Sequence, residues 1–110
     1  MSNATSPARA TARFLEETRA IVARVLGDAP VTVYLFGSFA SGTQRRSSDI
    51  DVAVEASGPL PHGLLARLRE ELEESCVPYR VDVVNLAEAD PTFRDEVRRT
   101  GRVWIERAGA

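Results

Sequence analysis

The chain has 110 residues, of which 44% are hydrophobic and 27% are charged, and its formal net charge at pH 7 is −2. This length favours one domain with a single modest core and is too short for a second substrate-binding domain. All fourteen basic residues are arginine, which excludes a lysine-dependent mechanism such as a Schiff base or a Walker-type P-loop. A mildly acidic chain lacks the basic footprint of a nucleic-acid-binding protein, so no nucleic-acid partner is expected.

The sequence also indicates a compartment. Cys76 is the one cysteine, so no disulfide can form within the chain, and this fits a reducing environment. No apolar run approaches the roughly 18 residues that a membrane span needs. The N-terminus lacks the basic and then apolar layout of a signal peptide. A cytoplasmic protein without a membrane partner is therefore expected.

Residues 1–5 are predicted to form a flexible tail, and residues 6–107 a single domain. The domain begins with a helix, because Ser6 is a good N-cap and Pro7 suits the first helical position. Apolar residues then recur at intervals of three and four, which is the period of a helix. The elements expected after this helix are a strand over 31–36, a helical turn and loop over 37–48, a strand over 49–55, a helix from 64 that ends before Pro78, a strand over 80–86, a helix from Asp90 to Gly101 and a short strand over 103–105.

This alternation of helices and apolar strands predicts an α/β (α+β) fold, with a small mixed β-sheet and helices packed mainly on one face. Cys76 falls on the apolar stripe of the helix that begins at Leu64, which predicts a small buried residue and not a nucleophile. Basic residues near the end of the following helix are interpreted as a solvated helix end favoured by the helix dipole. They are Arg94, Arg98, Arg99 and Arg102.

A Gly37-Ser38 dipeptide after the first strand, followed ten residues later by Asp49-Ile50-Asp51, is the most informative pattern in the chain. Side chains alternate along a strand, so Asp49 and Asp51 project from the same face. Two neighbouring carboxylates repel each other, and they become useful when they bind a hard divalent cation such as Mg2+. A Gly-Ser turn can offer N–H groups and a hydroxyl to a phosphate.

The strand over 80–86 carries a third acid, Asp82, within an apolar run. If this strand is the neighbour of the second strand, three carboxylates converge, and such a triad could bind two metal ions about 3.5–4 Å apart. Each feature alone has a simpler explanation: an acidic strand can be a solubility device, and Arg80 shares the face of Asp82 and could pair with it. Their joint occurrence favours a metal-dependent site for a nucleoside triphosphate.

Residues 36–43 (FGSFASGT) and 48–54 (SDIDVAV) resemble the signature of the DNA polymerase β-like nucleotidyltransferase superfamily. In length and spacing the chain resembles its minimal nucleotidyltransferase (MNT) group. The resemblance implies a nucleotidyltransferase fold in which Gly37 and Ser38 bind the triphosphate. It also implies that Asp49, Asp51 and Asp82 are the catalytic residues and the metal ligands.

The loop between these two segments departs from the pattern in part. Arg45 fits a frequent basic position and is the candidate contact to the triphosphate, with an ordinary solvated loop arginine as the alternative. Ser41 stands where many members carry a basic residue, and Arg46 where proline is common. No role is assigned to Arg46 or to His62.

The leading hypothesis is a Mg2+-dependent nucleotidyltransferase that uses two ions and transfers AMP from ATP to a hydroxyl acceptor. Asp82 is the residue expected to help remove the proton from that hydroxyl. Because the chain is short, the acceptor must be held by a partner or by a second copy, which implies a homo- or hetero-oligomer. The resemblance implies a tyrosine of a HEPN-domain toxin as acceptor, and therefore an antitoxin. The alternatives are a non-catalytic module that neutralises a toxin by contact and an enzyme that acts on a small molecule or an RNA end.

Overall fold

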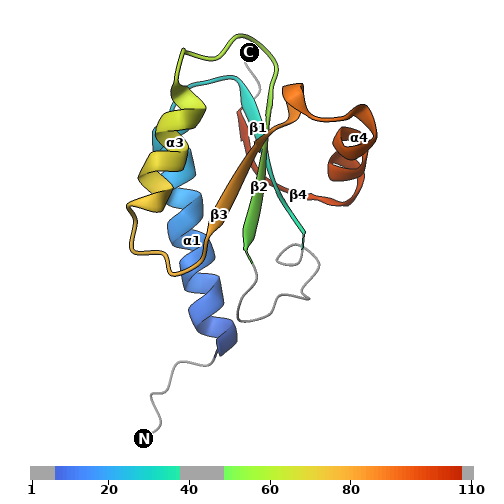
Figure 1. Ribbon diagram of the computed structural model, residues 1–110. Helices are drawn as coiled ribbons and strands as arrows, with labels where there is room; N and C mark the ends of the chain where they lie inside the picture. Colours follow the sequence, from blue (N-terminus) through green and yellow to red (C-terminus); the bar gives the residue numbers. More distant parts are fainter. Residues whose placement is uncertain (1–6, 38–48, 108–110) are drawn as a thin grey trace, which may run out of the picture.

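The computed structural model describes residues 7–37 and 49–107, which form one sheet and the helices around it (Figure 1). The order of elements confirms the order expected from the sequence, and the predicted helical turn after Gly37 lies outside the described residues, as does the tail over 1–5. None of the helices in the described ranges is long and apolar enough to cross a membrane. The elements are α1 (Pro7–Leu26), β1 (Val31–Phe36), β2 (Ile50–Ala56), α3 (Leu64–Glu73), β3 (Val81–Asn85), the 3-10 helix η1 (Leu86–Glu88), α4 (Pro91–Thr100) and β4 (Arg102–Arg107).

The four strands form a mixed sheet in the order β3-β2-β1-β4. β1 pairs antiparallel with both β2 and β4, whereas β2 pairs in parallel with β3. The parallel pair requires a crossover connection, and α3 supplies it. The two strands that carry the acidic motif are thus neighbours, as the convergence of three carboxylates requires.

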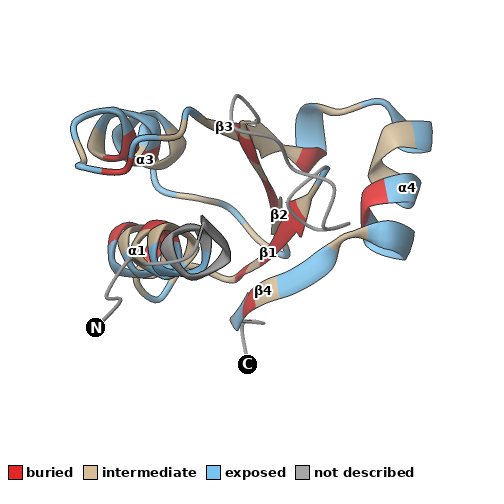
Figure 2. Cartoon of the chain, turned by 90° about the horizontal axis from the view of Figure 1, so that it is seen from below, coloured by how far each residue is buried: buried red, intermediate tan, exposed pale blue. Residues whose placement is uncertain are grey.

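Among the α-helices in the described residues, α1 and α3 cover one face of the sheet and α4 covers the other (Figure 2). This arrangement confirms the expected mixed sheet with helices mainly on one face. The main core lies between the sheet and α1 and α3, where β2 contributes Ile50, Val52 and Val54, all with 0% exposure. A smaller cluster lies under α4, with Tyr34, Ala53, Leu86 and Val97 at its centre.

The ends of α4 form as the sequence predicts. Asp90 is the N-cap, and its Oδ1 accepts a hydrogen bond from the N–H of Thr92 at 3.0 Å. Pro91 occupies the first helical position, where its missing N–H costs nothing. Gly101 ends the helix, and a Cβ at this position would lie 2.6 Å from the carbonyl oxygen of Val97. The chain therefore turns closely from α4 into β4.

The prediction for Cys76 is wrong, because this residue is exposed and lies beyond the end of α3. The helix ends at Glu73, and the Ser75 hydroxyl then donates a hydrogen bond to the carbonyl oxygen of Leu72 at 2.7 Å. The N–H of Val77 in turn donates to the Ser75 hydroxyl at 3.3 Å. This turn shifts the apolar position by one residue, so that Val77, and not Cys76, is buried.

Two valines in strands provide a matched test of this core. Val33 on β1 is 0% exposed, whereas Val103 on β4 is 56% exposed. We expect Val33→Ala to lower the free energy of unfolding by about 2–3 kcal/mol, because it removes buried methyl groups and leaves a cavity. We expect Val103→Ala to change it by about 0.5 kcal/mol or less. Urea unfolding measures both, and equal losses would contradict this description of the core.

Candidate active site

The parallel pairing of β2 and β3 places Asp51 directly opposite Asp82 in the register. Both side chains lie on the sheet face that α4 covers, since Asp51 alternates with the buried Val52 and shares its face with Ala53. Partial burial raises the pKa of Asp51, and the charges of Asp82 and then of Asp49 raise it further. Asp51 therefore feels the negative charge of both other predicted acids, Asp82 and Asp49.

These acids fit a divalent cation through the chemistry of their donors. Among the described residues, no group of three or more His, Cys, Asp or Glu side chains is gathered as a metal site. Mg2+ does not need such a cage, because it keeps several waters and binds through one or two carboxylates together with substrate phosphates. The opposed Asp51 and Asp82 supply two carboxylates, and a cation between them would relieve their repulsion.

Gly37 stands against the carboxylate of Asp51 at the end of β1. Its φ is +77°, in the left-handed region that favours glycine. A Cβ at position 37 would overlap Oδ2 of Asp51. Only glycine therefore allows the backbone to turn this close to the acid, and the turn that follows begins beside the carboxylate.

Asp82 forms an ion pair with Arg80, which is the simpler explanation that the sequence allowed for this acid. Arg80 Nε lies 3.4 Å from Asp82 Oδ1, and the two side chains are 77% and 42% exposed. An ion pair this exposed contributes about 0–1 kcal/mol, so Arg80 can exchange Asp82 for another anionic partner at little cost.

A cavity of about 880 Å3 opens beside these acids. Its size suits a small-molecule ligand, since such sites usually enclose about 300–1,000 Å3. Phe36 and Phe93 form one part of its wall, with ring centroids 5.5 Å apart in an edge-to-face arrangement. The other lining residues are Asp51, Arg69, Leu72, Glu73, Val77, Tyr79, Arg80, Val81, Asp82, Val83 and Val84.

Two of the predicted contacts to the nucleotide, Ser38 and Arg45, lie outside the described residues. His62 is exposed, in line with the absence of an assigned role. The structure thus brings Gly37 and Asp82 to Asp51, and it places Asp49 immediately before β2.

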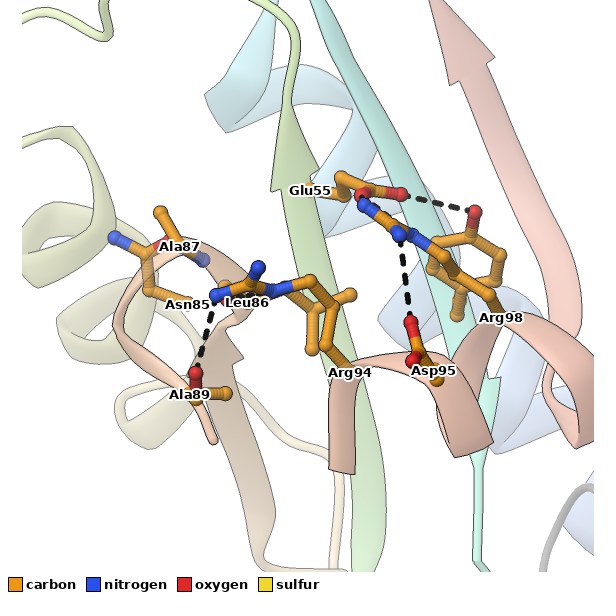
Figure 3. Close-up of polar contacts among 9 residues, drawn as sticks. Glu55, Asn85, Leu86, Ala87, Ala89, Arg94, Asp95 and Arg98 are labelled. Atoms are coloured by element: carbon orange, nitrogen blue, oxygen red, sulfur yellow. Dashed lines mark hydrogen bonds and ion pairs between the residues drawn. The ribbon is translucent and has the colours of Figure 1, made fainter. Parts of the chain in front are cut away.

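The prediction of a solvated helix end is wrong for Arg94, which is partly buried and bonded to the backbone, whereas Arg98 is exposed as expected. Arg94 donates from Nε to the carbonyl oxygen of Leu86 at 3.0 Å, and its terminal nitrogen donates to that of Ala89 at 3.1 Å. Arg98 donates to the carboxylate of Glu55 on β2 (Figure 3). Sequence reasoning missed Glu55, although it shares the alternation of Asp51 along β2. Arg99 and Arg102 are also exposed as expected.

A small mixed sheet with an acidic pair on adjacent strands and a glycine turn against one of the acids is the layout of a nucleotidyltransferase domain. Comparison with known families agrees. The family described as "Polymerase beta, Nucleotidyltransferase" matches residues 20–109. The chain therefore belongs to this family.

Two curated relatives are protein adenylyltransferases. The chain is 37% identical over 68 residues to "Probable protein adenylyltransferase MntA" of Haemophilus influenzae, covering 62% of this chain and 60% of the relative. It is 39% identical over 73 residues to "Protein adenylyltransferase MntA" of Shewanella oneidensis, covering 66% and 52%. The matches thus span a little more than half the length of these relatives.

Two similar solved structures are toxin–antitoxin complexes. One is described as a toxin–antitoxin with AMP-PNP, and its matching chain has a TM-score of 0.64 at 32% identity, with 80% of this chain and 73% of that chain covered. The other contains a tri-AMPylated HEPN toxin of Shewanella oneidensis in complex with an MNT antitoxin. Here the TM-score is 0.58 at 26% identity, with 83% and 71% covered.

The raised pKa of Asp51 leads to a prediction about stability. Because the pKa of Asp51 is higher in the folded chain than its ordinary 3.8, the folded protein loses stability as the pH rises from 3.8 through the folded-state pKa. We therefore expect Asp51→Asn, in EDTA at pH 7, to raise the free energy of unfolding by up to about 1 kcal/mol. This gain should shrink on acidification and vanish below the ordinary pKa of 3.8.

The exposed Asp28 provides the control, because Asp28→Asn should leave the melting temperature unchanged. Thermal melting across pH 3–7 measures both variants. An Asp51→Asn protein that is less stable than the parent in EDTA at pH 7 would contradict the proposed repulsion.

Gly37 and Gly63 form a second matched pair, with φ of +77° and +76°. A Cβ at Gly63 meets no atom within 4 Å, whereas one at Gly37 overlaps Asp51. We expect Gly63→Ala to cost about 1 kcal/mol of stability from the left-handed backbone alone. Gly37→Ala should cost more, because the acid must move as well. Urea unfolding compares the two, and equal costs would mean that Asp51 does not constrain position 37.

Proposed function

We propose that this chain is a Mg2+-dependent adenylyltransferase that transfers AMP from ATP to a hydroxyl of a partner HEPN toxin and thereby acts as its antitoxin. The observation that carries the proposal is the opposed pair Asp51 and Asp82 beside Gly37, in a cavity large enough for a nucleotide. The relatives named MntA support the reaction, and the MNT antitoxin bound to an AMPylated HEPN toxin supports the partner. The reducing environment that suits the exposed, unpaired Cys76 supports a cytoplasmic location.

In this proposal the acidic residues place the metal and the phosphates. Asp49, Asp51 and Asp82 would hold Mg2+, as two ions, and the cations would supply charge neutralisation for the triphosphate and the pyrophosphate. The backbone N–H groups of the turn at Gly37 and Ser38 contact the triphosphate, and Arg45 approaches it from the loop. Asp51, which is partly buried beside the charges of Asp82 and Asp49, would be stabilised as an anion by the bound cation.

The transfer itself is an in-line displacement at the α-phosphorus of ATP. The acceptor hydroxyl oxygen forms a bond to that phosphorus, the bond to the β-phosphate bridging oxygen breaks, and pyrophosphate leaves with the electron pair. Asp82 accepts the hydroxyl proton, and Arg80 moves away from it as the acceptor enters. Orientation and charge stabilisation supply most of the rate, because no covalent enzyme intermediate is needed.

The acceptor is the tyrosine side chain of the HEPN toxin. In this proposal the cavity beside the acids takes one nucleotide, and another protein presents the acceptor. The solved complexes of similar antitoxin chains with their toxins support this arrangement. A contact antitoxin would keep the fold and would not need the three acids.

An active-site variant separates the enzyme from the contact antitoxin. We expect the Asp49→Asn, Asp51→Asn double variant to lose AMP transfer to the toxin by at least about 100-fold, since the metal ligands are removed. It should also lose the rise in melting temperature that Mg2+ and ATP give to the parent. Radiolabelled ATP and thermal melting are the measurements, with Asp28→Asn as the control that keeps both.

Binding of the double variant to the toxin should survive, because the substitutions leave the core intact. If this variant neutralises the toxin as well as the parent does, the chain is a contact antitoxin. If the parent itself shows no shift with Mg2+ and any nucleoside triphosphate, the nucleotide site is refuted.

A further inference from the structure

A polar cluster away from the acids ties α4 to the sheet. The carboxylate of Glu55 on β2 accepts hydrogen bonds from Arg98 on α4, with Nε at 2.8 Å, and from the Tyr34 hydroxyl on β1 at 3.1 Å (Figure 3). Asp95, one turn before Arg98, lies 3.7 Å from its guanidinium. We call Glu55, Arg98 and Tyr34 the α4 anchor.

The three elements joined by the α4 anchor also form one side of the candidate site. Tyr34 is two residues from Phe36 on β1, and Glu55 is four residues from Asp51 on β2, so each pair shares a face of its strand. Arg98 is on the same helix as Phe93. β1, β2 and α4 are therefore joined by polar contacts at one end, and at the other end they present Phe36, Phe93 and Asp51 to the cavity.

Apolar packing alone holds α4 weakly. Val97 is its one buried residue, with 2% exposure, and Phe93 is only partly buried. The remaining fixed contacts are polar: Arg98 to Glu55, and Arg94 to the carbonyl oxygens of Leu86 and Ala89. The position of Phe93 therefore depends on arginines at two points along the helix.

We propose that Glu55 and Arg98 are positioning residues that hold Phe93 against Phe36, and that these two rings form the seat for the nucleotide base. The inference rests on the proposed function, because it requires a nucleotide whose phosphates lie at Asp51. Neither Glu55 nor Arg98 lines the cavity, so both act through α4.

The shape and chemistry of the cavity favour the base as the group that meets these rings. Its volume of about 880 Å3, which extends past Asp82 to Leu72 and Val77 on the α3 side of the sheet, lies in the range of sites for small-molecule ligands. Two aromatic rings packed edge-to-face form an apolar corner of one ring face and one ring edge, and a planar aromatic group can pack against either. Phe36 directly precedes Gly37, and it pairs with Asp51 across the strands, so this surface begins where the phosphate end of the site begins.

The test compares the binding of Mg·ATP with that of Mg·tripolyphosphate, which has the phosphates and no base. The variants are Glu55→Gln, Arg98→Met, Arg98→Lys and Phe93→Ala. Arg24→Met is the control, because Arg24 forms a similar ion pair with Glu71 at 3.0 Å between α1 and α3, on the opposite face of the sheet. Titration calorimetry well below each melting temperature gives the dissociation constants.

We expect Glu55→Gln and Arg98→Met to weaken Mg·ATP binding about fivefold and to leave Mg·tripolyphosphate binding unchanged. Arg98→Lys, which keeps the charge beside Glu55, should recover part of this loss. Phe93→Ala should reproduce the loss, and adding Arg98→Met to it should weaken binding no further, because both changes remove the same contact. Arg24→Met should bind both ligands as the parent does.

The outcomes distinguish the inference from the function on which it rests. If the parent binds both ligands and the α4 anchor variants bind ATP as the parent does, the inference is wrong and the proposed function stands. If the variants lose ATP and tripolyphosphate binding in parallel, the residues are merely structural and the inference is again wrong. If the parent binds neither ligand, the proposed function is refuted and the inference with it.

Discussion

The register of β2 in the centre of the sheet is the constraint on which the candidate site depends. Ile50, Val52 and Val54 are fully buried on one face, and a slip of one residue would exchange them with Asp51 and the rest of the other face. The main core therefore fixes the register that places Asp51 opposite Asp82. β2 thus contributes both to the core and to the candidate site, and burial of its apolar face determines the face on which its acids lie.

The two faces of the sheet differ in how they are covered. The α1 and α3 side carries a continuous apolar core that includes buried residues from all four strands. The α4 side has a small apolar cluster with charged side chains at both of its ends. Carboxylates can lie on the α4 side because it is only partly buried, whereas full burial of an unpaired carboxylate would cost far more free energy. Because α4 buries little apolar surface on this side, the acids stay accessible, and Arg94 and Arg98 make the polar contacts that attach the helix.

Local patterns predicted much of this structure from the sequence. The order of elements and the Asp90 cap of α4 follow from periodicity and turn residues. The adjacency of the strands that carry Asp51 and Asp82 was a condition of the predicted convergence, and the parallel pairing of β2 and β3 meets it. The burial of Cys76 was predicted wrongly, because a single hydrogen-bonded turn at Ser75 changes which residue faces inward. The partners of Arg94 and Arg98 could not be predicted, since they come from β2 and the segment after β3, and no local pattern encodes that long-range packing.

The two carboxylates on the α4 side of β2 show how one strand separates structure from function. Hydrogen bonds from Arg98 hold the pKa of Glu55 below its usual range, so this carboxylate is stable as an anion. Partial burial and the neighbouring acids raise the pKa of Asp51, and no cation among the described residues pairs with it. A carboxylate with a fixed arginine partner stabilises the fold, whereas one that lacks a partner destabilises it until a cation arrives. Asp51, whose charge no cation among the described residues compensates, is therefore where the proposed metal would stabilise the fold most directly.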